Sequence, residues 1–141
     1  MKISLLLICL SLGLLISCGQ KKEESKTGMY EPTELALLMK KMLADYGKAK
    51  AQLDQNKIVE NRVDYISDIL TAEATDPKDI NDLYRALGQP FIEQATKYAQ
   101  TGDTLSRQIE MHNLTIQTCI KCHESFCGGP IDAIKKLIVK P

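Results

Sequence analysis

The stretch that decides the fold is TLSRQIEMHNLTIQTCIKCHESF, residues 104–126. Side chains that can face a protein interior recur in it at intervals of three and four residues, which places them on one face of a helix. They are Leu105, Ile109, His112, Ile116, Cys119 and His123. A helix with one such stripe needs partners to cover the stripe, so we expect a helical assembly around it.

The preceding chain contains further segments with helical periodicity and none with useful strand alternation. The expected helices cover residues 33–53, 59–70, 80–100 and 104–126, followed by a short closing helix over 131–138. The third is expected to be interrupted at Gly88 and Pro90, with a stripe that starts at Ile80 and Leu83 and resumes at Phe91. The sequence therefore predicts an all-α fold, an antiparallel four-helix bundle with a short C-terminal extension helix.

The N-terminus has the pattern of an export signal, with Lys2 followed by a long apolar run. This run ends in LISC, residues 15–18, which is similar to the lipobox of bacterial lipoproteins. We expect a signal peptide over 1–17, lipidation at Cys18, a tether over 18–31 and one domain over 32–141. The alternative is an ordinary signal peptide with a chance cysteine. The expected location is the periplasmic side of the cell envelope, anchored to a membrane by lipid.

Charge and cysteine usage narrow the class of protein. The chain has 18 basic and 18 acidic residues and few aromatic ones, so we expect no nucleic-acid binding. Of its five cysteines, Cys9 belongs to the expected signal and Cys18 to the expected anchor. The other three, Cys119, Cys122 and Cys127, fall within nine residues. That clustering indicates a binding site and not a disulfide framework.

On a helix, Cys119, Cys122 and His123 share one face. Covalent attachment of a c-type haem requires this arrangement, with two thiols along one edge of the ring and an imidazole that reaches the iron. Zinc bound by the three cysteines and His123, or a redox dithiol, are the alternatives. His112 is expected to be a packing residue, because it lies about 16 Å from His123 along the same helix.

Beside this motif, the chain resembles the class II cytochromes c, the cytochrome c prime family. TCIKCHESF (118–126) is similar to the family's C-x-x-C-H-x-x-F ending, and LLMKKML (37–43) and AEATDPKDI (72–80) resemble its first helix and its link before the third. The likeness spans roughly residues 33–127. It implies one covalent haem c and electron transfer with redox partner proteins of the envelope, without catalysis of its own, and it allows a homodimer.

The resemblance implies that the group opposite His123 comes from the first helix. Met39 is the expected sixth ligand of the iron, and Met42 is the second choice. The alternative is a five-coordinate haem that binds nitric oxide or carbon monoxide. Two features depart from the family. Cys127 stands where the family commonly has a basic residue, and the chain after it is longer than the family's usual ending. The free thiol of Cys127 is expected either to pack in the interior or to contact the His123 imidazole.

Overall fold

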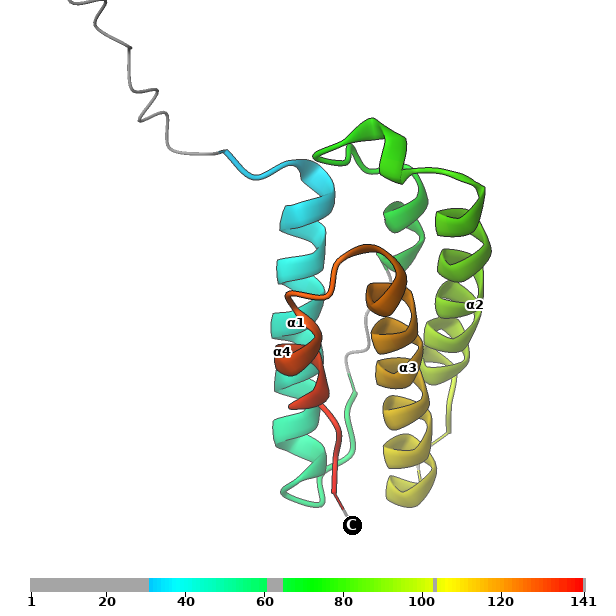
Figure 1. The fold of residues 1–141 in the computed structure, drawn as a ribbon. Coiled ribbons are helices and arrows are strands. Elements are labelled where there is room, and N and C mark those ends of the chain that lie inside the picture. The colour runs from blue at the N-terminus through cyan, green and yellow to red at the C-terminus, as the bar shows by residue number, and fades with distance from the viewer. Residues whose placement is uncertain (1–30, 61–64, 103, 141) are drawn as a thin grey trace, which may run out of the picture. The chain divides into compact units, whose positions relative to one another are not determined.

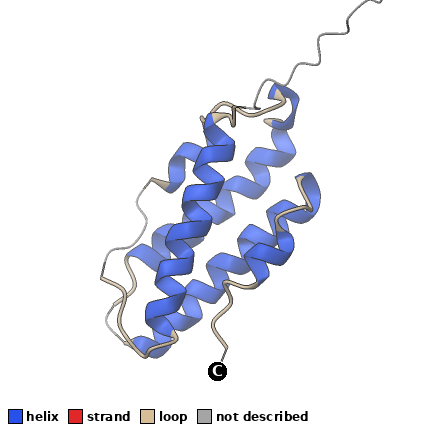
Figure 2. Ribbon diagram, turned by 90° about the vertical axis from the view of Figure 1, so that its left-hand side faces the viewer, coloured by secondary structure: helices blue, strands red, loops and turns tan. Residues whose placement is uncertain are grey.

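The computed structural model describes residues 31–60, 65–102 and 104–140. The helices of these ranges are α1 (Glu34–Leu53), η1 (Ile66–Leu70), η2 (Pro77–Asp79), α2 (Asp82–Ala99), α3 (Leu105–Phe126) and α4 (Ile131–Lys135), where η denotes a 3-10 helix. The described ranges contain helices and loops without a strand (Figure 2), so the all-α prediction is confirmed. The expected signal peptide, Cys18 and the tether up to residue 30 lie outside these ranges.

Helix α3 lies against both α1 and α2 and runs antiparallel to them (Figure 1). After α1 the chain turns at Asn56, which has a φ of 57°, and then returns along the other helices. This return passes through η1, which contacts α1 and α2. After α3 the chain reverses once more into α4, which packs on α3. None of the helices in the described ranges is both long enough and apolar enough to cross a bilayer.

The prediction of one continuous helix over residues 59–70 is wrong. Only Ile66–Leu70 is helical, as the 3-10 helix η1, and residues 61–64 lie outside the described ranges. Val59 lies in irregular chain with its side chain buried, and its N–H donates to Oε1 of Gln108 on α3 at 2.9 Å. The periodic spacing arose because both Val59 and η1 face the core. A β-branched residue with a buried side-chain acceptor for its N–H has no need of a helix.

The expected break at Gly88 and Pro90 is also wrong, since α2 continues through both residues. Pro90 is exposed, and the packing of α2 on α3 and η1 outweighs the loss of one helical hydrogen bond there. Gly88 has a packing role. A Cβ atom at Gly88 would lie 2.8 Å from Cδ2 of Leu70, so glycine lets η1 approach α2 closely.

The chain after α3 forms a C-terminal strap, which we define as residues 131–139. Helix α4 ends at Lys135, before the expected 138, and the rest of the strap is held by side chains of α3. His112 donates from Nε2 to the Leu137 carbonyl at 2.9 Å. Asn113 makes two bonds to Val139, donating to its carbonyl and accepting from its N–H, both at 2.9 Å. These bonds replace the helical ones that the last residues lack.

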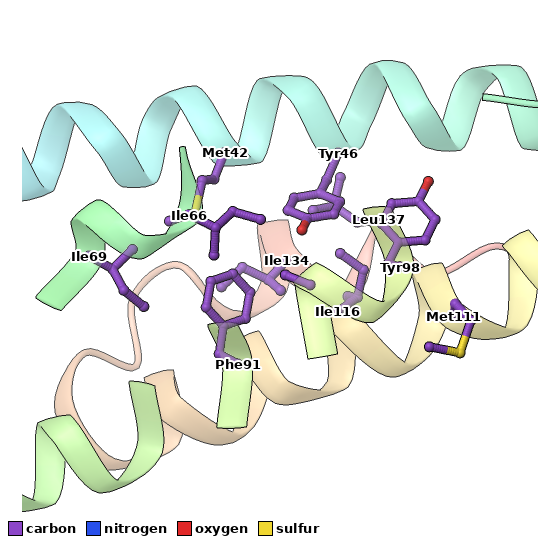
Figure 3. Packing of buried hydrophobic residues seen from close by; sticks show 11 residues of the cluster. Met42, Tyr46, Ile66, Ile69, Phe91, Tyr98, Met111, Ile116, Ile134 and Leu137 are labelled. Carbon is purple, nitrogen blue, oxygen red and sulfur yellow. The ribbon is translucent and has the colours of Figure 1, made fainter. Parts of the chain in front are cut away.

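The core is formed where α1, α2, α3, η1 and the strap meet (Figure 3). Tyr46 and Tyr98 stack at 6.2 Å between ring centroids, and each ring packs edge-on against His112 at 5.8 and 5.7 Å. His112 is fully buried. Because the Leu137 carbonyl can only accept, His112 carries its proton on Nε2, and its Nδ1 has no hydrogen-bond partner among the described residues.

The burial of His112 makes the stability of the fold sensitive to acid. Burial lowers the pKa of His112 below its usual 6.5, and this effect outweighs the hydrogen bond to the Leu137 carbonyl, which raises it. Below pH 6.5 the unfolded chain therefore binds a proton that the folded chain rejects, so the free energy of unfolding falls as pH falls. We expect the free energy of unfolding to decrease as the pH falls through 6.5, by no more than about 1.4 kcal/mol per pH unit for this one proton. Urea unfolding followed by circular dichroism measures it.

In His112→Gln this pH dependence should flatten over the same range, while the stability at pH 7 drops. An unchanged slope in the variant would show that another group carries the effect.

Candidate functional site

Four elements surround a hollow at the α3 C-terminal end of the core. It encloses about 320 Å³ not occupied by atoms, part of it open to solvent. Its lining comes from α1, η1, α2 and α3 and consists of Met39, Met42, Ile69, Tyr84, Phe91, Cys119, Cys122 and His123. All five haem-site residues expected from the sequence are in this lining.

Helix α3 presents Cys119, Cys122 and His123 to the hollow from one unbroken face. Opposite them, α1 presents Met39 and Met42, which are three residues apart and so also share a face. Met42 is buried with Ile66 and Phe91 in the core, whereas Met39 is half-buried and packs against the core from its edge. The helix that carries the thiols and the imidazole therefore faces the helix that carries the thioethers.

A hydrogen bond to the backbone fixes the imidazole of His123. Its Nδ1 lies 3.1 Å from the carbonyl oxygen of Cys127. A carbonyl oxygen only accepts, so Nδ1 carries the proton and the lone pair of Nε2 is left for a ligand. A bond from the second ring nitrogen to a carbonyl is the usual support of a metal-binding histidine. The Cys127 side chain is exposed, so the expectation that it packs is wrong, and the contact with the imidazole is made by the backbone carbonyl and not by the thiol.

The thiols in the hollow are held in their protonated form. Burial, and then the neighbouring Cys122, raise the pKa of Cys119 to about 12, and burial also raises the pKa of Cys122. A redox dithiol depends on the opposite change, a lowered pKa that supplies a thiolate. Within the described ranges, no three His, Cys, Asp or Glu side chains are grouped to hold a metal ion, so the zinc arrangement expected as an alternative is not assembled there.

Sequence reasoning missed three residues of the lining: Ile69, Tyr84 and Phe91. Tyr84 donates from its hydroxyl to the Ile69 carbonyl at 2.7 Å, which ties α2 to η1, and its ring packs edge-on against Phe126 at 5.5 Å. Burial raises the pKa of Tyr84 to about 12, so the hydroxyl stays a donor.

A sequence signal for Tyr84 existed. Counting back from Phe91 in steps of three and four gives Gly88 and Tyr84, one continuous stripe. Because a helix break was expected at Gly88, the stripe was not continued back to Tyr84. It was assigned to Leu83 instead, whose side chain is 54% exposed.

Comparisons of the chain with protein-family models, with curated proteins and with solved structures gave no match.

The raised thiol pKa values predict the order in which the cysteines react. In the chain made without residues 1–18 and without haem, iodoacetamide at pH 8 should modify Cys127 first, then Cys122, and Cys119 last. Raising a thiol pKa from 9.0 to about 12 lowers its thiolate fraction about a thousand-fold, and burial slows access further. Mass spectrometry of peptides over time gives the order. Fast modification of Cys119 or Cys122 would instead favour the redox dithiol.

Proposed function

We propose that this chain is a monohaem c-type cytochrome that transfers electrons. The observation that carries the proposal is the meeting of Cys119, Cys122 and His123 on α3 with the two methionines of α1 across one mostly apolar hollow. The resemblance to the class II cytochromes c, seen in the sequence, agrees with this arrangement. A bound haem c would supply one-electron redox chemistry at its iron.

The residues of α3 would hold the haem covalently. Each of the Cys119 and Cys122 sulfurs would form a thioether with one vinyl group, the thiol hydrogen moving to the neighbouring vinyl carbon, so that nothing would be released. His123 offers Nε2 to the iron because its Nδ1 proton is engaged by the Cys127 carbonyl. The hollow is partly open to solvent, so an edge of the bound group would remain accessible to a redox partner protein.

The sixth ligand is proposed to come from α1. Met39 and Met42 are about 4.5 Å apart along the helix axis, so both sulfurs can be considered. Met42 is buried in the same core cluster as Ile66 and Phe91, and moving its sulfur toward an iron would remove that packing. Met39, at the edge of the core, can move at lower cost. We therefore propose Met39 as the ligand, with Met42 as the second choice and a five-coordinate, gas-binding haem as the alternative function.

The cellular setting is proposed from the sequence. Lipidation at Cys18 would anchor the domain to a membrane on the periplasmic side of the envelope, where c-type haem is attached. Its partners would then be redox proteins of the envelope. We propose no catalytic activity and no nucleic-acid binding, in line with the balanced charge of the chain.

Haem attachment is tested by producing the full chain in a host with c-type maturation machinery. The intact mass should rise by one haem, and the pyridine haemochrome spectrum should be that of haem c. The double variant Cys119→Ser/Cys122→Ser should lose both signals. Cys127→Ser is the matched control and should keep both, because the Cys127 side chain is exposed and does not line the hollow. A chain of unmodified mass in that host would contradict the proposal.

The sixth ligand is tested by Met39→Leu, which nearly conserves volume. The unsubstituted protein should show the methionine–iron charge-transfer band in the red and should bind carbon monoxide slowly. Met39→Leu should lose the band and bind carbon monoxide rapidly, whereas Met42→Leu should keep the band and lose some stability. Loss of the band only in Met42→Leu would make Met42 the ligand. If the unsubstituted protein lacks the band, the gas-binding function replaces electron transfer.

A further inference from the structure

The carbonyl that fixes His123 belongs to the last residue attached to α3. Cys127 is extended, with φ −149° and ψ 87°, and its N–H donates to the His123 carbonyl at 3.0 Å. That bond fixes the position of its nitrogen. The direction of its carbonyl depends on the next peptide plane, and so on where the chain goes after Cys127.

The chain that follows has little to fix it locally. Gly128 and Gly129 have no positive φ, and a Cβ atom on either would meet nothing within 4 Å. Neither glycine is therefore needed for an unusual turn or for close packing. Two successive glycines make a link of high conformational entropy, so contacts made by the chain beyond the link have to set its path.

The C-terminal strap supplies that fixed point. An unbroken set of backbone bonds joins the link to the strap: Ile131 N to Gly128 O at 3.1 Å, then Ala133 N and Ile134 N to Pro130 O at 2.9 and 3.0 Å. The strap itself is anchored by its buried side chains Ile134, Leu137 and Val139 and by its bonds to His112 and Asn113.

We propose that the strap is a positioning element for His123. The docked strap sets the path of residues 128–130, this path aims the Cys127 carbonyl, and the carbonyl keeps the His123 proton on Nδ1. Without the strap the proton can also occupy Nε2, the atom that a metal needs. Asn113 is then a positioning residue. It lies ten residues before His123, about 15 Å along α3, and it does not line the hollow.

The proposed effect of the strap on the position of the His123 proton does not require haem. Its consequence for the iron rests on the proposed function. A hydrogen bond from Nδ1 to a carbonyl makes the imidazole a stronger donor to iron, which favours the ferric state. Release of the strap should therefore raise the reduction potential of the haem-loaded protein.

The test compares the unsubstituted chain with Asn113→Ala and with a chain ending at residue 130. Tyr65→Phe is the matched control, since it removes one partly buried hydrogen bond, from Tyr65 to Asp45 at 2.6 Å, and leaves the strap intact. In the haem-free chain at pH 8, two-bond ¹H–¹⁵N spectra of the histidine rings report the position of each proton. The two histidines of the chain are distinguishable, because His112 carries its proton on Nε2 and His123 on Nδ1.

We expect His123 to be in the Nδ1–H form in the unsubstituted chain and in Tyr65→Phe. Asn113→Ala and the shortened chain should show a mixture of both forms. Faster amide exchange at Val139 in Asn113→Ala would verify that the strap has loosened. If His123 keeps its proton on Nδ1 in Asn113→Ala with this exchange accelerated, or in a shortened chain that still folds, the inference is overturned.

The haem-loaded proteins give the second readout. The reduction potential should rise in Asn113→Ala and stay unchanged in Tyr65→Phe, and an unchanged potential in Asn113→Ala would overturn the role toward the iron. A failure of haem to attach would instead count against the proposed function. The spectra of the haem-free chain would still decide the role of the strap.

Discussion

One face of α3 meets two demands, and the rest of the structure follows from them. Its first half buries Gln108, His112, Thr115 and Ile116 completely, so neighbouring elements have to cover that face. Its second half presents Cys119, Cys122 and His123 to the hollow. Because both halves lie on one helical stripe, the register that packs the core also aims the site. Any rotation of α3 about its axis would disturb both together.

The polar residues on this face direct the segments that are not regular helix. Gln108 accepts from Val59 and holds the return chain, and His112 and Asn113 hold the strap. Each is a side chain of α3 that binds a backbone group with no helical partner. Side chains of α3 therefore hold the segment around Val59 and the C-terminal strap in place, and these two segments complete the core.

These contacts also mark what the sequence could and could not predict. The spacing of residues along the sequence predicted α1, α3 and five residues of the hollow, because the residues of one helical face lie three and four positions apart. It failed over 59–70, where Val59 satisfies its N–H on a side chain 49 residues away. It failed at Gly88, whose role is set by Leu70 on another element. Pairings between distant segments leave no local pattern, and the end of α4 was missed for the same reason.

The two-glycine link before the strap bears on the order of folding. The bonds between α3 and the strap join residues only 25 and 26 positions apart, and the strap leaves the ribosome after α3. Helix α3 can thus pack on α1 and α2 first, and the strap can close over His112 as a late step with a small loop-closure cost. Until that step the buried His112 ring would lack its hydrogen bond to the Leu137 carbonyl.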